Sequence, residues 1–276
     1  MRKACGLWIL LSFLWLFTGC NLITVKEDFS REIDLGSIKS LSVQTKNGSI
    51  EFYGKEGSSI TIRGQKRVQG LGNLDEEIKK IIISYDLQGD QLVVKAQAPS
   101  DGNFFTKSSY GANFVIDLPT NLFSQVSGNT SNGSVKVQNL ETALQLHTSN
   151  GGIDLRNTKG RIQADTSNGG IDLFQVVLKE GTNALSTSNG RIEGDIVLPS
   201  TGSCRLHTSN GRIDIRVPAS SAFNFIASTS NGSVDFSGLS VLLTQSDKNR
   251  KSGTVNNGGP LLDLATSNGV IRLEGF

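Results

Sequence analysis

The chain has 276 residues, of which 19% are charged and 37% hydrophobic, a composition that fits neither a disordered chain nor a polytopic membrane protein. Two of its 27 basic residues, Arg2 and Lys3, lie in residues 1–19, which contain no acidic residue, so residues 20–276 have as many basic as acidic residues. A nearly neutral chain lacks the basic field that phosphates require, which argues against nucleic acid as a partner. The 31 glycines without a collagen period favour many tight turns and short strands.

Residues 1–19 are predicted to form a lipoprotein signal peptide. Arg2 and Lys3 precede an apolar run over residues 7–17, which is too short to span a bilayer stably and suits a signal peptide. The run ends in Phe-Thr-Gly-Cys at residues 17–20, which resembles the lipobox of bacterial lipoproteins, although Phe17 stands where that pattern usually has Leu. The resemblance implies that Cys20 is acylated and becomes the new N-terminus. The alternative is an ordinary secretory leader with an incidental cysteine.

The lipobox interpretation places the mature protein in the cell envelope. Its domain would then lie outside the cytoplasm, bound to membrane lipid through the acylated cysteine, because two or more acyl chains give stable attachment. Residues 20–34 are expected to be a linker next to the anchor.

Residues 35–125 predict an irregular β-rich portion that could cover the first rung of a repetitive domain. Apolar and polar residues alternate over residues 41–53 and 59–63. The charges of residues 74–80 suit one or two helical turns, with acids early and lysines late. Residues 81–87 and 91–96 flank Gln-Gly-Asp and predict a hairpin. Residues 100–112, and later 244–260, are expected to be loops.

The tetrapeptide Thr-Ser-Asn-Gly recurs through residues 126–276, with a Thr-Lys-Asn-Gly variant at residues 45–48. Successive asparagines of the full copies are 18 or 21 residues apart, except for a last step of 37. Each Asn-Gly is followed by one variable residue and then by alternating apolar and polar residues, as in Ile153-Asp154-Leu155. Alternation also precedes each turn, so each copy predicts two short strands joined at a corner. The predicted corner asparagines are Asn47, Asn132, Asn150, Asn168, Asn189, Asn210, Asn231 and Asn268.

Two architectures fit this repeat. Asn-Gly alone suits separate hairpins in a meander or barrel, because both residues tolerate positive φ. The similarity of the flanks favours a coil instead, in which equal positions stack about 4.8 Å apart and the asparagine amides hydrogen-bond along the axis. We therefore predict an all-β fold, a parallel β-solenoid with stacked rungs of 18–21 residues and an irregular β-rich N-terminal portion.

These features resemble a known family. The lipidation cysteine, the segment Phe-Val-Ile-Asp-Leu-Pro at residues 114–119 and the copies of Ser-Asn-Gly-x-Ile-Asp-Leu are similar to the bacterial putative-adhesin family of β-solenoid proteins, a domain of unknown function. The resemblance covers roughly residues 35–276. It implies the architecture, but no catalytic or ligand residues are established for the family and none is carried over.

One outward column of the predicted solenoid is acidic. Its members, bounded by Lys136 and Arg272, are Asp154, Asp172, Glu193, Asp214 and Asp235. Stacked like charges destabilise a sheet, and Arg191 and Arg212 are placed to offset two of them. The column is thus either a partly paired charge ladder or a weak site for a divalent cation such as Ca²⁺, whose usual ligands are carboxylate oxygens.

No cofactor is predicted, and no metal beyond that column. His147 and His207 fall three rungs apart, roughly 14 Å, which is too far to share an ion. Cys204 is left without a disulfide partner and is expected to be a buried hydrophobe.

The leading functional hypothesis is a non-catalytic envelope lipoprotein that presents a solenoid surface to an unknown protein or glycan partner. One alternative is a carbohydrate-active β-helix enzyme, which would need paired acids in a cleft. Another is a structural or sensory component of an envelope complex.

Overall fold

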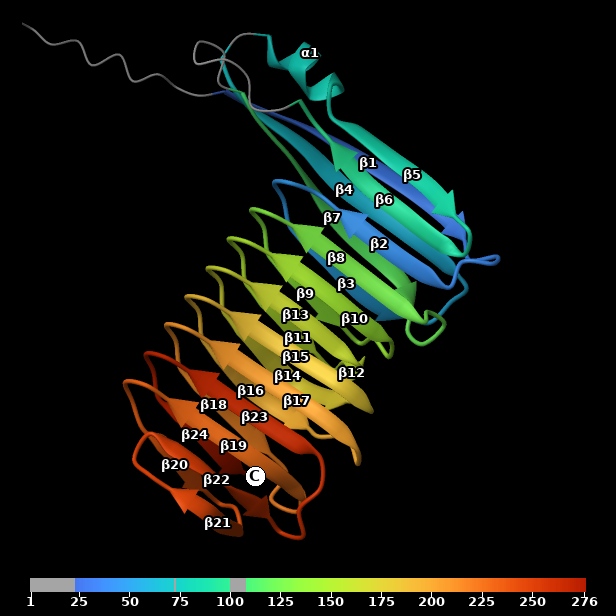
Figure 1. Cartoon of the computed structure of the whole chain (residues 1–276). Coiled ribbons are helices and arrows are strands. Elements are labelled where there is room, and N and C mark those ends of the chain that lie inside the picture. The colour runs from blue at the N-terminus through green and yellow to red at the C-terminus, as the bar shows by residue number, and fades with distance from the viewer. Residues whose placement is uncertain (1–22, 72, 100–107) are drawn as a thin grey trace, which may run out of the picture.

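The computed structural model describes residues 23–71, 73–99 and 108–276; the predicted signal peptide and Cys20 lie outside these residues. The strands form two long sheets, here called sheet A and sheet B, that face each other along an elongated body (Figure 1). One short helix, α1 (Leu74–Lys79), lies at the N-terminal end of this body, where helical turns were predicted. The prediction of an all-β solenoid is confirmed.

Each sheet is a continuous row of strands. In spatial order, sheet A contains β1 (Ile23–Asp34), β4 (Ser59–Gly70), β7 (Ser109–Pro119), β3 (Ile50–Lys55), β9 (Val135–Gln138), β11 (Ile153–Arg156), β14 (Ile171–Leu178), β16 (Ile192–Val197), β18 (Ile213–Val217), β24 (Ile271–Gly275) and β20 (Val234–Ser237), with β12 (Lys159–Gly160) beside β14. Sheet B contains β21 (Val241–Ser246), β22 (Arg250–Val255), β19 (Phe223–Thr229), β23 (Leu261–Thr266), β17 (Gly202–Thr208), β15 (Gly181–Thr187), β13 (Ile162–Thr166), β10 (Ala143–Thr148), β8 (Gln125–Thr130), β2 (Ser40–Gln44), β6 (Gln91–Gln97) and β5 (Ile82–Gln88).

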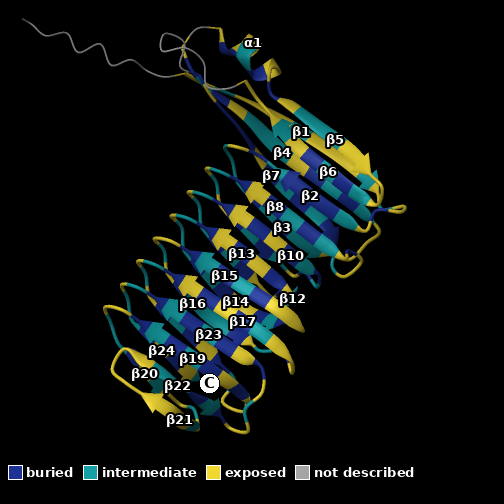
Figure 2. Cartoon of the chain, in the orientation of Figure 1, coloured by how far each residue is buried: buried dark blue, intermediate teal, exposed yellow. Residues whose placement is uncertain are grey.

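Successive copies of the repeat stack in register in both sheets. Ile153 of sheet A pairs with Val135 on one side and Ile171 on the other. Leu144 of sheet B pairs in the same way with Val126 and Ile162. These residues are almost completely buried, while the residues that alternate with them along each strand are intermediate or exposed (Figure 2). Period-two alternation therefore places one column of apolar side chains above another between the sheets.

The spatial order of the rungs differs from their order in the sequence at both ends. The last copy in the sequence, β23 and β24, is not the last rung in space. It lies between the rung of β17 and β18 and the rung of β19 and β20. At the other end β6 and β7 stack outside the first rung, β2 and β3, on the side away from β8 and β9. The spacing of the repeat could not reveal this spatial order, because the copies are so similar that each could stack on several others.

Three sequence expectations were wrong. Residues 23–34, expected to be linker, form the edge strand β1, which pairs along its whole length with β4. This segment resembles a linker in sequence because most residues of the edge strand are charged or polar and face solvent. Only every fourth residue, Val25, Phe29 and Ile33, packs on the core. Residues 109–112, expected in a loop, begin β7, and the expected loop at 244–260 contains most of the antiparallel hairpin β21–β22. That hairpin is an insertion that explains the 37-residue step.

Candidate functional site

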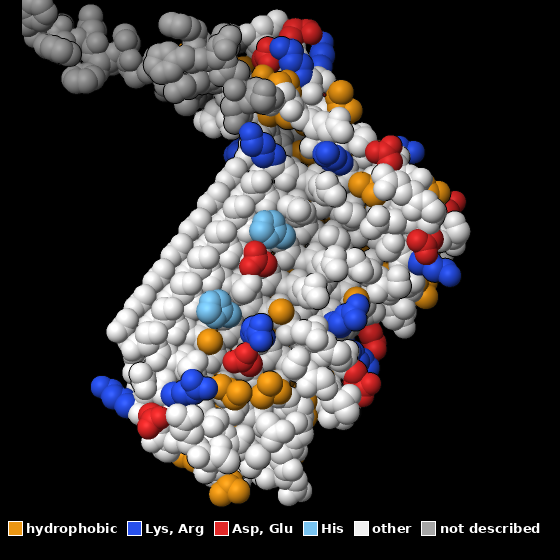
Figure 3. Space-filling model, viewed as in Figure 1, with side chains coloured by type: hydrophobic (Ala, Val, Ile, Leu, Met, Phe, Trp, Pro, Cys, Tyr) orange, Lys and Arg blue, Asp and Glu red, His pale blue; other side chains and the backbone are white. Residues whose placement is uncertain are grey.

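The predicted corner asparagines form one continuous ladder. Each side-chain NH₂ donates to the Oδ1 of the asparagine in the neighbouring rung at 2.6–2.9 Å, in the spatial order Asn231, Asn268, Asn210, Asn189, Asn168, Asn150, Asn132 and Asn47. Asn47 ends the ladder by donating to the carbonyl of Tyr110. All the bonds point the same way, and Figure 3 shows the corners as a straight ridge without coloured side chains. This ridge is a structural element, as the repeat predicted.

The threonine and glycine of each corner act between rungs. The Thr166 hydroxyl donates to the carbonyl of Gly151 in the adjacent rung at 2.7 Å, and the other Thr-Ser-Asn-Gly corners repeat this bond, while Thr45 of the variant corner donates to the carbonyl of Ala112. A Cβ added to Gly169 would lie 1.9 Å from the same carbonyl oxygen. Of the corner glycines, Gly48 alone has a positive φ. Close stacking, and not the left-handed conformation of a hairpin turn, requires glycine here.

The register confirms most of the acidic column but corrects its end. Asp154, Asp172, Glu193 and Asp214 occupy successive rungs on the outer face of sheet A. Asp235 is separated from them by Arg272, because the inserted strand β24 lies between β18 and β20. Four carboxylates are therefore contiguous.

Arginines neutralise this column. Arg156 holds Asp154 through bonds of 2.9–3.1 Å, and Arg191 lies 3.1 Å from Asp172 and 2.6 Å from Glu193. Arg212 also reaches Glu193 at 2.6 Å, and Arg272 lies 3.6 Å from Asp214. Burial raises the pKa of Glu193, but the bonds from Arg212 and Arg191 outweigh it and hold that pKa below its usual value. Among the described residues, no group of three or more His, Cys, Asp or Glu side chains could hold a metal ion.

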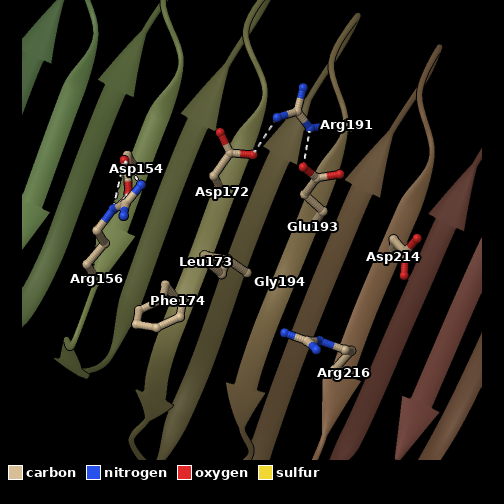
Figure 4. A pocket seen from close by; sticks show the side chains of 10 residues that line it. All are labelled: Asp154, Arg156, Asp172, Leu173, Phe174, Arg191, Glu193, Gly194, Asp214 and Arg216. Carbon is tan, nitrogen blue, oxygen red and sulfur yellow. Dashed lines mark hydrogen bonds and ion pairs between the residues drawn. The ribbon is translucent and has the colours of Figure 1, made fainter.

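A depression of about 470 Å³ lies over this column on the outer face of sheet A (Figure 4). Phe174 of β14 stands between Arg156 of β11 and Arg216 of β18 in this view. Phe174 is 48% exposed. Arg216 is itself held by Asp195 through two bonds of 2.6 and 2.9 Å. The depression therefore combines an accessible aromatic ring with side chains fixed by ion pairs.

An irregularity in the pairing of β14 with β16 lies at this depression. Leu173 pairs with Gly194 and Val176 with Ile196, so Phe174 and Gln175 together oppose the single residue Asp195. Gln175 has a φ of 53°, and Gly194 has a φ of 130° with no room for a Cβ beside the carbonyl oxygen of Leu173. Phe174 points outward by ordinary alternation, as its partner Arg156 does, and the bulge adds Gln175 as a second exposed residue beside it.

The sequence reasoning missed Phe174. It lies within the apolar run Leu-Phe-Gln-Val-Val at residues 173–177, which reads as ordinary core. One signal could have found it: phenylalanine replaces the arginine of the preceding copy, Arg156, with which it pairs.

The two histidines lie on the outer face of sheet B, away from the depression. His147 Nδ1 lies 3.1 Å from Asp165 Oδ2, and the Ser186 hydroxyl donates to the same carboxylate. The serine bonds the carboxylate and not the imidazole, so these three residues lack the serine–histidine bond of a hydrolase triad. Three rungs separate His147 from His207, as predicted.

Cys204 lies in an inward column and is 1% exposed, as predicted. Burial raises the pKa of its thiol to about 12. No helix in the described part of the chain is long and apolar enough to cross a membrane.

Comparison with known proteins identifies the fold family. The profile of the Toastrack DUF4097 family matches residues 23–274. No curated protein matches the chain. Similar solved structures include a "putative cell adhesion protein" from Clostridium sporogenes (12% identity, 91% of this chain and 100% of that chain covered, TM-score 0.39) and a "putative adhesin" from Bacteroides fragilis (13% identity, 91% and 97%, TM-score 0.36). A third is a "putative lipid binding protein" from Parabacteroides distasonis (9% identity, 89% and 96%, TM-score 0.29).

The family match confirms the resemblance that the repeat suggested. Because the profile match runs from the first residue of β1 into β24, this chain belongs to the Toastrack DUF4097 family.

Proposed function

We propose that this protein is a non-catalytic lipoprotein of the bacterial cell envelope, anchored through Cys20, that binds a partner on the outer face of sheet A. The observation that carries the binding proposal is the exposed ring of Phe174, set in a depression among fixed polar side chains. Exposed aromatic groups with a polar surround are typical of recognition surfaces.

The state of the carboxylates supports a binding role over a catalytic one. Hydrolysis of a glycosidic bond needs one carboxylic acid that holds a proton and a second that stays ionised. Here Asp154, Asp172 and Glu193 all contact arginines, and the bonds from Arg212 and Arg191 hold the pKa of Glu193 below its usual value. Glu193 is therefore poorly suited to donate a proton to a leaving group.

The proposed anchor fits the start of the described chain. Only Asn21 and Leu22 separate Cys20 from Ile23, the first residue of β1. The lipid would therefore be attached directly to an edge strand of the folded domain.

Photocrosslinking in living cells tests the binding proposal. A photoreactive phenylalanine analogue at position 174 should form covalent adducts with an envelope component. The matched control is the same analogue at Phe276, which is 61% exposed but lies at the C-terminus, outside the depression. Adducts at 174 that exceed those at 276 support the proposal, whereas equal or no adducts at 174 reject this face as the binding surface.

The anchor is tested separately with Cys20→Ala. The unchanged protein should incorporate labelled palmitate and sediment with membranes, and the variant should do neither. Palmitate incorporation by the variant would show that Cys20 is not the lipidated residue.

A further inference from the structure

We infer that the depression around Phe174 is a binding site for a neutral saccharide. This inference rests on the proposed function, because it names the chemical class of the partner on the outer face of sheet A. It is argued from the exposed ring, the fixed polar side chains beside it and the charge balance around it.

The rung of Phe174 is the last of three that share one bend. Gln175 has a φ of 53°, and Asn157 and Asn139, at the equivalent positions of the two preceding rungs, have φ values of 50° and 55°. Among the parallel strand pairs that the structure describes, the pair β14–β16 is the one whose register shifts, because β16 has one residue fewer than β14 at this bend. Phe174 points outward by ordinary alternation, and Gln175 lies exposed beside it. What distinguishes this rung is the aromatic side chain at the position where the preceding rung has Arg156.

The exposed ring suits the apolar face of a sugar. Phe174 occupies a column that carries Gln138, Arg156, Arg216 and Glu274 in nearby rungs, with Asp195 opposite the bulge and Tyr53 beyond Gln138. An exposed aromatic ring among polar side chains offers a flat apolar surface of limited area. The C–H face of a pyranose ring has a matching shape and polarity, while its hydroxyls point to the side.

The polar side chains around the ring suit those hydroxyls. Bidentate pairs fix Arg156 to Asp154 and Arg216 to Asp195, one pair on each side of Phe174. Each pair presents N–H donors next to carboxylate acceptors, and a sugar hydroxyl both donates and accepts. Because the ion pairs already hold these side chains, ordering them on binding costs little entropy.

The charge balance favours an uncharged ligand. Every carboxylate that lines the depression contacts an arginine, so neither an anion nor a cation meets a surplus of opposite charge. A peptide that binds by strand addition needs a free sheet edge, whereas β14 has β11 on one side and β16 on the other. A neutral saccharide needs neither a surplus of charge nor a free sheet edge.

Binding of short neutral oligosaccharides of glucose, galactose, mannose and N-acetylglucosamine to the mature chain tests the inference, on an array and then in titration. For the oligosaccharide that binds best, Phe174→Ala should weaken binding about tenfold, the scale of a lost stacking contact. Phe174→Trp should retain binding, because it keeps an aromatic face. Phe276→Ala, which removes an exposed ring elsewhere, should bind as the unchanged chain does.

Two outcomes would overturn the saccharide site. One is an absence of binding to every oligosaccharide on the array by a chain whose thermal unfolding is normal. The other is binding that Phe174→Ala leaves unchanged. If either occurs while the analogue at position 174 still crosslinks to an envelope protein, the proposed function stands and the ligand class is wrong. If crosslinking also fails, the face itself is not a binding surface.

Discussion

The corner glycines are fixed by distance between rungs. At Gly169 the carbonyl oxygen of Gly151 leaves no space for a methyl group, and a Cβ would lie 1.9 Å away. A Cβ added to the adjacent Gly170 would have its nearest neighbours, the Cγ and the carbonyl oxygen of Arg191, at 3.4 Å, which is ordinary contact. Two consecutive glycines of one corner therefore carry very different constraints, although the sequence alone makes them look alike.

Replacing these two glycines separates the constraints. Gly169→Ala should lower the free energy of unfolding by about 3 kcal/mol, because the rungs must move apart to admit the Cβ. Gly170→Ala should change it by less than about 0.5 kcal/mol. Urea unfolding of both variants measures the difference. Equal losses would mean that glycine is needed at both positions for backbone conformation.

Cys204 should be inert in the folded protein. Its pKa is raised to about 12 by burial, so the folded state keeps the proton that the unfolded thiol loses near its ordinary pKa of 9.0. Its contribution to stability is fully present below pH 9.0 and is lost as pH rises toward about 12.

Thiol labelling at about pH 8 checks this prediction, with fast reaction expected only in denaturant. Cys204→Ala should lose part of the fall in unfolding free energy between pH 9 and about 12. Rapid labelling of the native chain would show that this column opens, or that it is less well packed than the structure indicates.

At the scale of elements, the sequence predicts the strands and corners of a single rung better than the order in which the rungs stack. Period-two alternation identified the corners and the inward columns, because burial between two sheets leaves an apolar residue at every second position. Asp235 was assigned next to Asp214 because its copy follows in the chain. The later strand β24 has a similar sequence and occupies the place next to β18 instead. The hairpin β21–β22 lies between the two copies in the sequence and reverses the chain direction before β24.

Phe174 shows a second limit of the same kind. Periodicity describes what the rungs share, so a residue that serves only one rung lies outside the pattern. Phenylalanine stands where the two preceding copies have Arg156 and Gln138, and an average over copies removes that difference. Substitutions that depart from the repeat are therefore the better guide to function in a solenoid.

The inserted last copy should stabilise the rung that precedes it in the chain. Among the described strands β20 pairs with β24 alone, and β19 pairs with β23 and β22. A chain that ends at residue 258 lacks β23 and β24. We expect it to lose hydrogen-exchange protection in β19 and β20, while β10 and β13, several rungs away, stay protected, because each rung contacts its neighbours only.

Retained protection in β20 after this truncation would contradict the prediction. It would mean that β18 and β20 can pair directly once the inserted strand is gone. A control chain that ends at residue 274 keeps most of β24 and should behave as the full chain does.

At the scale of the whole molecule, the two ends of the solenoid differ. The N-terminal end carries the long charged strand β1 and helix α1, and the opposite end carries the hairpin β21–β22 (Figure 1). The ten strand spacings between β1 and β20 make the body roughly 50 Å long. Ile23 begins β1 beside Gly70 of β4, and Leu71 follows, 56% exposed. An anchor at Cys20 would therefore hold one defined end.

A short tether turns this asymmetry into an orientation. Three residue steps from Cys20 to Ile23 span at most about 10 Å, which is much less than the length of the body. The solenoid can then tilt, but its far end cannot approach the bilayer unless the whole body lies flat. The surface around Leu71 should face the lipid, and Leu242 on β21, 70% exposed, should point away from it.

Energy transfer in reconstituted vesicles measures this orientation. A donor dye is attached to Leu71→Cys or Leu242→Cys, and the acceptor is a labelled lipid headgroup; the buried Cys204 should not compete for the dye. We expect efficient transfer from position 71 and weak transfer from position 242, because roughly 50 Å of stacked strands separates the two ends. The same variants with Cys20→Ala should show no transfer, since nothing then holds the chain to the vesicle. Equal transfer from both positions in the anchored protein would mean that the body lies along the membrane, and the outer face of sheet A would then be less accessible to partners beyond it.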